Sequence, residues 1–157
     1  MNRFILTTVL LLAGNTPALA DGKVHANPAT PCSHGNFKPH ELCFEIPGDG
    51  VARAEHLSET FYAVILKTAE RCTIPEEERL QIQALFPKNK VFSMRFFCDD
   101  DIEENVGYTN VNDKFGFLAV YAGRTLKDAK AYLEQVKTTG SFPGANIRKM
   151  QARFVYP

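Results

Sequence analysis

The sequence predicts an α+β fold in which an antiparallel sheet carries two helices on one face and an irregular arm precedes the sheet. Two observations lead to this prediction. A strand–helix–strand pattern occurs over residues 60–98 and again over residues 115–155, and two such halves in tandem give a βαββαβ domain. A stretch rich in proline and glycine, without apolar periodicity, precedes the first half. We therefore expect an arm over residues 21–59 and a domain over residues 60–157.

The first twenty residues have the layout of a secretory signal peptide. A short basic start precedes an apolar run over residues 4–13, and Ala18-Leu19-Ala20 fits the small-x-small rule for signal peptidase. Roughly ten apolar residues are too few to cross a hydrocarbon core of about 30 Å. We expect a signal peptide over residues 1–20 and a mature protein in a bacterial periplasm or outside the cell, with no membrane anchor.

The charge balance excludes one class of partner. The chain has 18 basic and 18 acidic residues, so its formal net charge is zero. A protein that binds nucleic acid through the phosphates needs a basic surface. The balance and the export signal both argue against nucleic acid as a partner.

The first strand–helix–strand half begins with a strand over residues 61–68, which is rich in β-branched and aromatic residues. Thr73 is placed to cap a helix, because Glu76 three residues later completes a capping box. Pro87 ends this helix, since proline cannot continue one. Residues 91–98 then form the second strand of the half.

The second half repeats this order after a polar connection over residues 99–114. Its first strand covers residues 115–122, which are almost entirely apolar. Thr125 begins a second capping box, and Gly140 is a natural C-terminal cap for the helix between them. The last strand is expected over residues 146–156.

One face of the predicted sheet should be open to solvent or to a partner. Right-handed crossovers put the first and third strands at the centre and both helices on one face. Alternation along each strand then assigns side chains to the two faces. The residues assigned to the helix-covered face are Val64, Leu66, Phe92, Met94, Phe96, Leu118, Val120, Met150, Ala152 and Phe154. The residues assigned to the open face are Ile65, Lys67, Ser93, Arg95, Phe97, Phe117, Ala119, Tyr121, Lys149, Gln151 and Arg153.

The open face combines aromatic rings with cationic and amide side chains. Aromatic rings stack on the apolar side of a sugar ring, and arginine binds carboxylates with two parallel hydrogen bonds. The alternative interpretation is a half-solvated sheet face that binds nothing. A register error of one residue in any strand would also exchange the two faces of that strand. The candidate ligand-binding residues are Arg95, Phe97, Phe117, Tyr121, Lys67, Gln151 and Arg153.

Residues 117–147 resemble half of a SPOR domain, the sporulation-related repeat that binds peptidoglycan. The shared pattern is an apolar strand that ends at Gly123, a helix with small residues at 128–133, then Gly140 and another strand. The half over residues 61–98 has the same order but lacks the strand-end glycine and the usual Gln-x-Gly. Other ferredoxin-like domains share this order of elements. The resemblance implies a non-catalytic module of the bacterial envelope that binds glycan strands on its open sheet face.

Four cysteines remain in the mature chain, and an even number in an exported protein favours two disulfides. Cys72 and Cys98 close two strands at the same edge of the domain, so converging loops can bring their Cα atoms within about 7 Å. We favour Cys72–Cys98 together with Cys32–Cys43. A crossed pairing would instead tie the arm to the domain.

The arm offers a metal site as an alternative. Cys32, His34, His40 and Cys43 supply two thiols and two imidazoles, which are ligand types of tetrahedral zinc sites. Their spacing matches no standard zinc module, and exported thiols are usually oxidised. The acidic run at 99–104 lacks the fixed oxygen spacing of a calcium loop. We therefore expect no cofactor and rank metal binding third among the possible functions.

The sequence contains no catalytic motif of the serine-hydrolase, zinc-protease or phosphate-loop type. His56 and Ser58 form the one tight cluster of a base with a nucleophile, but helical neighbours two positions apart do not face each other. We predict a non-catalytic binding module, with peptidoglycan as the first ligand. The second hypothesis is a protein–protein interaction module or inhibitor of the envelope, which would use its edge strands or the connection at 99–114.

Overall fold

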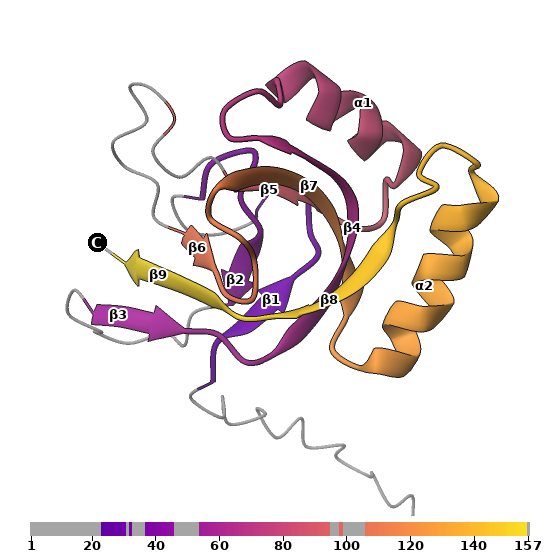
Figure 1. The fold of residues 1–157 in the computed structure, drawn as a ribbon. Helices are drawn as coiled ribbons and strands as arrows, with labels where there is room; N and C mark the ends of the chain where they lie inside the picture. The colour runs from indigo at the N-terminus through magenta and orange to yellow at the C-terminus, as the bar shows by residue number, and fades with distance from the viewer. Residues whose placement is uncertain are drawn as a thin grey trace, which may run out of the picture.

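The computed structural model shows a mixed α+β fold with antiparallel sheets and two helices, which confirms the predicted fold class at this level (Figure 1). The residues that the structure describes are 23–30, 32, 37–45, 54–94, 98 and 106–156. The predicted signal peptide lies outside them. Neither helix in this part of the chain is long and apolar enough to span a membrane.

The central layer is a four-stranded antiparallel sheet with the strand order β5-β7-β4-β8. Its strands are β4 (Phe61–Glu70), β5 (Val91–Ser93), β7 (Phe115–Gly123) and β8 (Asn146–Met150). The two longest strands, β4 and β7, lie in the middle and carry most of the apolar residues. Short strands therefore form both edges of this sheet.

Helix α2 (Leu126–Thr138) follows β7 and packs on the central sheet (Figure 1). Thr125 caps it as predicted, because its hydroxyl accepts a hydrogen bond from the Asp128 N–H at 3.1 Å. Gly140 ends the helix with a φ of 67°, and its N–H donates to the carbonyl of Lys137 at 3.0 Å. Both predicted boundaries of this helix are confirmed.

Helix α1 (Glu76–Leu85) covers the same face of the sheet but begins differently from the prediction. Its N-cap residue is Pro75, which makes no side-chain cap bond. The Thr73 hydroxyl donates instead to the carbonyl of Glu70 at 2.7 Å, within the turn that leaves β4. The capping box expected at Thr73 is therefore absent, and the three glutamates of the first turn stabilise this helix end instead.

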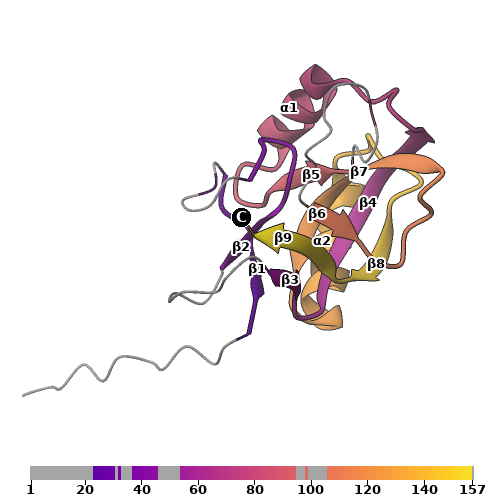
Figure 2. The same ribbon diagram turned by 90° about the vertical axis from the view of Figure 1, so that its left-hand side faces the viewer.

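The arm is not irregular throughout, which corrects the prediction for residues 21–59. A second sheet has the order β3-β9-β6 and contains one strand of the arm, and a separate two-stranded sheet, β1-β2, lies within the arm. The strands are β1 (His25–Asn27), β2 (Cys43–Glu45), β3 (Ala54–Leu57), β6 (Val106–Tyr108) and β9 (Ala152–Tyr156). Figure 2, in which the second sheet faces the viewer, shows β3, β9 and β6 in front of the central sheet.

The predicted last strand, 146–156, divides at Gln151 into β8 and β9, which belong to different sheets. The side-chain amide of Gln151 donates to the carbonyl of Ser58 at 2.9 Å, and its backbone N–H donates to the Thr109 hydroxyl at 2.9 Å. These bonds hold the corner at which the chain leaves the central sheet. Gln151 thus has a structural partner on each side, rather than lying on an open face.

The two faces of the central sheet bury separate apolar clusters, so the predicted open face is wrong for most of its area. On the helix-covered face the cluster contains Val64, Leu66, Val91, Leu118 and Val120 from the sheet, with Ile82, Phe86, Ala129 and Val136 from the helices. On the opposite face it contains Phe61, Ala63, Ile65, Phe92, Met94, Phe117, Ala119, Tyr121 and Met150, covered by Val24, Ala26, Leu42, Phe44, Val106, Tyr108 and Ala152. The arm and the second sheet therefore cover what the sequence predicts to be open.

Two strands have the reverse of their predicted orientation. Phe92 and Met94 pack in the cluster away from the helices, as do Met150 and Ala152, although all four were expected to face the helices. Ser93 pairs with Leu118, and Lys149 pairs with Tyr62, so these two residues lie on the helix-covered side. Alternation cannot tell the faces apart here, because the sheet buries apolar residues on both of them.

A bulge in β4 reverses the alternation within that strand. The pairing register with β7 shifts between Ile65 and Lys67, so Lys67 lies opposite Leu118 on the helix-covered side. Its ammonium group forms an ion pair with Glu78 of α1 at 2.7 Å. The assignment of Lys67 to the open face is therefore wrong, and the cause is one extra residue that no alternation pattern shows.

Both predicted disulfides are present. Cys32 and Cys43 have Cα atoms 5.6 Å apart, and Cys72 and Cys98 have Cα atoms 5.3 Å apart. The first bond closes a loop within the arm, and the second ties the end of β4 to the chain that follows β5. Two disulfides fit a protein exported to an oxidising compartment.

Candidate functional site

The structure does not bring the seven predicted ligand-binding residues together on one surface. Phe117 and Tyr121 are 3% and 6% exposed, because the arm and the second sheet cover their rings. Arg153 is exposed, but it pairs with Glu55 of the neighbouring strand at 2.8 Å. Lys67 lies on the helix-covered side, where it pairs with Glu78, and Gln151 lies at the corner between β8 and β9, where it bonds to Ser58. Arg95 and Phe97 lie outside the described residues, as do Phe96 and the side chain of Phe154.

Tyr121 has a core role. Its ring packs against that of Phe61 with the centroids 6.0 Å apart. Burial raises the pKa of the Tyr121 phenol, while the charge of Arg124 and its hydrogen bond to the phenol lower it. A phenol held in this way stabilises the domain and is not available to a ligand as a stacking surface.

A pocket of about 280 Å³ lies on the face away from the helices, at the end of the sheet where β7 and β8 begin. It is half open to solvent. The lining residues are Ile65, Thr68, Val111, Asn112, Phe115, Gly116, Phe117, Asn146 and Arg148. Among the predicted site residues that lie in the described part of the chain, Phe117 alone lines it. The pocket lies on the sheet face that the sequence predicts to be open.

The sheet register assembles the pocket from three strands. Thr68 of β4 lies opposite Phe117 of β7, and Ile65 of β4 lies opposite Asn146 of β8. Ile65 and Phe117 belong to the buried cluster and form an apolar floor. The ring of Phe115 is 48% exposed and stands where β7 begins, so it adds an aromatic surface that water reaches.

Four polar side chains line the pocket, namely those of Thr68, Asn112, Asn146 and Arg148. The Asn112 carbonyl oxygen accepts a bond from the Lys114 N–H at 3.0 Å, which leaves its amide N–H groups available as donors. The Asn146 amide nitrogen donates to the Gly144 carbonyl at 3.2 Å, which leaves its carbonyl oxygen available as an acceptor. The exposed guanidinium of Arg148 pairs with no carboxylate among the residues that the structure describes.

The lining consists of apolar, hydroxyl, amide and guanidinium groups. None of the nine lining residues is an aspartate, glutamate, histidine, cysteine or lysine. General acid–base catalysis needs a positioned group that titrates near the working pH, and the Thr68 hydroxyl has no such partner in the lining. The pocket therefore offers an aromatic surface, a fixed positive charge and amide groups to a ligand.

Sequence reasoning missed Arg148 and Asn146 because it placed the last strand the wrong way round. Alternation puts Asn146, Arg148 and Met150 on one face, and Met150 was assigned to the helices. The signal was present in the sequence: an arginine and an asparagine in one set argue against a helix-covered face for that set. Phe115 was missed because it stands at the first position of its strand.

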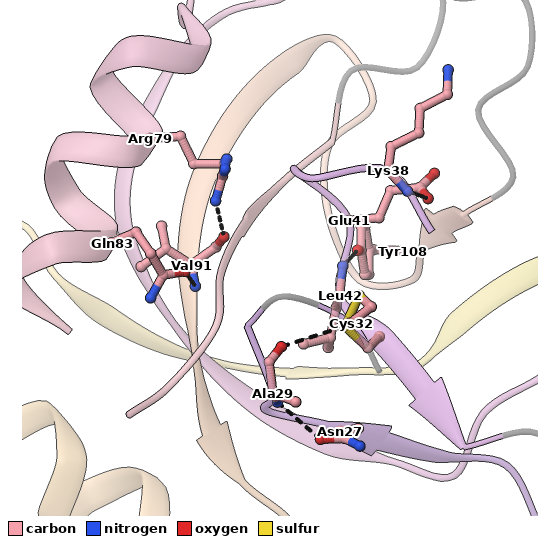
Figure 3. Close-up of a disulfide and its surroundings, with 11 residues drawn as sticks. Asn27, Ala29, Cys32, Lys38, Glu41, Leu42, Arg79, Gln83, Val91 and Tyr108 are labelled. Atoms are coloured by element: carbon pink, nitrogen blue, oxygen red, sulfur yellow. Dashed lines mark hydrogen bonds between the residues drawn. A yellow bond between two sulfur atoms is a disulfide. The ribbon is translucent and has the colours of Figure 1, made fainter. Parts of the chain in front are cut away.

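A second polar cluster joins α1, β5 and the arm. Arg79 is 3% exposed, Lys90 is 2% exposed and Glu41 is 1% exposed. The Arg79 guanidinium donates to both carboxylate oxygens of Glu76 at 2.9 Å and to the carbonyl of Val91 at 3.0 Å. Figure 3 shows Arg79 and the neighbouring Gln83 directed from α1 toward Val91.

The arm completes this cluster from the other side (Figure 3). The carboxylate of Glu41 accepts a hydrogen bond from the Lys38 N–H at 2.7 Å. The next residue, Leu42, donates its N–H to the phenol oxygen of Tyr108 at 3.0 Å. Burial lowers the pKa of Lys90 to about 8, helped by the Arg79 guanidinium and opposed by the carboxylates of Glu76 and Glu41. Two backbone bonds join the arm to this region, from the Lys90 N–H to the Pro28 carbonyl at 3.1 Å and from the Ser93 N–H to the His40 carbonyl at 2.9 Å, so we assign the cluster to holding the arm.

The structure leaves no thiols for the zinc site that the sequence offers as an alternative in the arm. Cys32 and Cys43 are bonded to each other and so do not form the pair of thiolates that a zinc site would need. His34 lies outside the described residues. Within those residues, no group of three or more histidine, cysteine, aspartate or glutamate side chains is arranged to hold a metal ion.

The chain was compared with protein families, curated proteins and solved structures. No protein-family model, curated protein or solved structure matches the chain. The resemblance to a SPOR domain thus stays a prediction, and the functional argument rests on the geometry of the pocket.

Proposed function

We propose that this protein is a non-catalytic binding module of the bacterial envelope, periplasmic or secreted, and that its pocket binds a glycan, with peptidoglycan strands as the first ligand. One observation carries the proposal. The pocket joins a half-exposed aromatic ring, Phe115, to an arginine without a carboxylate partner in the described chain, Arg148, and to two amides. No acid–base group stands among them.

The lining is complementary to a sugar ring. The Phe115 ring offers an apolar surface on which the C–H face of a pyranose can stack. Asn112 supplies amide donors and Asn146 an amide oxygen, which together match the hydroxyl and acetamido groups of an amino sugar. The proposal keeps the sequence prediction of aromatic and forked donor groups on this face, with Phe115 and Arg148 as the groups and Tyr121 assigned to the core.

The size of the pocket sets the length of glycan that it holds. Its volume of about 280 Å³ lies just below the range of roughly 300–1,000 Å³ for drug-sized ligands. One sugar ring fits such a space, and the half-open shape lets the rest of a strand continue into solvent. We therefore expect weak binding of each unit and retention on a long glycan through many sites.

The proposal is tested by sedimenting the mature protein, residues 21–157, with purified peptidoglycan sacculi, before and after an amidase removes the stem peptides. We expect retention that increases on the stripped glycan. Phe115→Ala should lower retention several-fold, because it removes the stacking surface. Leu126→Ala, which removes a side chain of similar exposure from α2, is the matched control and should retain the wild-type level.

The choice of variants follows from burial. Tyr121→Ala would create a cavity in the core and lose retention by unfolding, so it cannot test binding. Phe115→Ala changes a residue that is 48% exposed and should keep the thermal stability of the wild type. If the wild-type protein sediments with neither form of sacculi, the glycan proposal is rejected.

A protein partner is the second candidate function, and one observation on α1 favours it. Leu80 and Leu85 are 53% and 54% exposed on a helix of ten residues. Large apolar side chains at this exposure occur at protein–protein contacts as well as singly on ordinary surfaces. The hypothesis is tested by chemical cross-linking in the envelope. We expect the wild type to cross-link to a protein partner and the variant with both leucines changed to serine to lose this product, while its retention on sacculi equals that of the wild type.

A further inference from the structure

We infer that the pocket selects an anionic sugar, with the carboxylate of the ligand paired to the guanidinium of Arg148. The inference rests on the proposed function and narrows it to a class of substrate: a pyranose that carries a carboxylate. It is drawn from the placement of Arg148 relative to the other charges of the molecule and from the lining of the pocket.

Arg148 differs from several other cations of the structure in its surroundings. Lys67 pairs with Glu78 at 2.7 Å, Arg79 with Glu76, Lys137 with Glu134 at 2.9 Å, and Arg153 with Glu55 at 2.8 Å. Arg148 has no carboxylate partner within the described part of the chain, although it lines a pocket. Its place on β8, opposite Ala63 of β4, is fixed by the sheet register.

The pocket strengthens the attraction between Arg148 and an anion. The buried side chains of Ile65 and Phe117 form its floor, so a bound carboxylate is screened by less water than on an open surface. No carboxylate lines the pocket to compete for the guanidinium. The planar fork of arginine matches the two oxygens of a carboxylate with parallel hydrogen bonds. A neutral sugar of the same shape lacks the carboxylate and therefore cannot form this charge-assisted pair.

The remaining polar groups restrict the position of the charge on the ligand. Asn146 projects from the same strand as Arg148, two residues away and on the same face, and offers an acceptor to a hydroxyl or amide N–H. The ligand therefore needs a donor close to its carboxylate and an apolar ring face toward Phe115. Two kinds of sugar meet this description: one with its carboxylate on the ring carbon chain, as in a uronic acid, and one with a lactyl ether, as in muramic acid.

Two pairs of sugars test the effect of the carboxylate on binding. They also distinguish a uronic acid from muramic acid as the source of that carboxylate. The mature protein is titrated with N-acetylmuramic acid and N-acetylglucosamine, which differ by the lactyl group, and with glucuronic acid and glucose, which differ by the carboxylate. We expect the acid of one pair to bind about ten-fold or more tightly than its neutral partner, as charge-assisted hydrogen bonds allow. The pair that shows the difference identifies the source of the carboxylate.

Arg148→Gln should remove this difference while the neutral sugars bind as before. Arg148→Lys, which keeps the charge but loses the fork, should recover part of the difference. Lys127→Gln on α2 removes one exposed positive charge from the other side of the sheet and should bind like the wild type. The melting temperature of each variant is measured to show that its fold is unchanged.

The outcomes separate this inference from the proposed function. Equal binding of acid and neutral sugars, or an unchanged preference in Arg148→Gln, overturns the inference and leaves glycan binding in place. If none of the four sugars binds, the variant is compared on sacculi, and retention equal to that of the wild type overturns the inference. If the wild-type protein binds neither the four sugars nor the sacculi, the proposed function is overturned, and the inference with it.

Discussion

Lys90 is almost fully buried between α1 and the arm, and this burial lowers the pKa of its ammonium group to about 8 from 10.5. Removal from water is the main cause, and the Arg79 guanidinium adds to it. Between about pH 8 and 10.5 the unfolded chain therefore binds more protons at this residue than the folded chain does, so stability rises with pH through that window. Below about pH 8 the protein bears the full cost of burying a charged lysine.

We predict that Lys90→Met removes this rise and makes the protein more stable at neutral pH. The measurement is the free energy of unfolding in urea, compared at about pH 7 and about pH 9.5. Burial raises the pKa of the Tyr132 phenol to about 12, which acts in the opposite direction above about pH 10, so the scan stops below that point. The exposed Lys88→Met is the control. If the free energy of unfolding of Lys90→Met rises with pH as in the wild type, Lys90 is not the cause of that rise.

At the scale of elements, the two helices share a sequence signal that only one of them uses. Both begin near a threonine with an acidic residue three positions later, and both patterns predict a capping box. In α2 the Thr125 hydroxyl accepts from the Asp128 N–H. In α1 the chain extends two further residues to Pro75 before the helix starts, so Thr73 stays in the preceding turn. Pro75 decides between the two outcomes, because a proline disfavours helical backbone at the residue before it, Ile74, and so prevents the helix from starting directly after Thr73.

We predict that Thr125→Ala lowers the free energy of unfolding by about 1 kcal/mol, the usual effect of losing an N-cap. Thr73→Ala should cost clearly less, because its hydroxyl bonds only to the exposed Glu70 carbonyl. Denaturant unfolding of both variants gives the comparison. Equal losses would mean that Thr73 caps α1 after all.

The sequence identified the elements of the central sheet well. All four of its strands and both helices lie where the apolar runs and the helix signals predict them. These elements are long or bounded by proline and glycine, so local pattern suffices to find them. The extra strands β1 and β6 have three residues each and little pattern of their own. Their strand conformation depends on pairing with distant segments, which local sequence does not report.

At the scale of the whole molecule, the main error was the expectation of an open sheet face. The arm contributes Val24, Leu42 and Phe44 to a cluster on that face, and the second sheet adds Tyr108. A proline-rich stretch looks disordered when it is considered alone, yet a disulfide and contacts with the sheet order it. The alternating pattern that separates buried from exposed residues then fails, because both faces of the sheet are buried.

The candidate site shows the same limit. Sequence reasoning expected aromatic and arginine side chains together on one face, and the pocket contains such a pair. It missed Asn146 and Arg148 because strand orientation was wrong in the last strand, and it assigned Tyr121 to the ligand although the core buries this residue. Of the five predicted site residues that the structure describes, Phe117 alone lines the pocket. The position of a loop such as that at Val111 and Asn112, which forms one wall, follows from tertiary packing alone.

The most direct test of the proposal is an NMR titration of the isotope-labelled mature protein with soluble peptidoglycan glycan fragments, which locates the binding site on the fold. We predict that the largest saturable shift changes fall on the backbone amides of Val111, Phe115, Asn146 and Arg148 around the pocket, with little change on α1. Saturable changes centred on α1 or on the arm, with the pocket amides unmoved, would contradict the account and assign recognition to another surface.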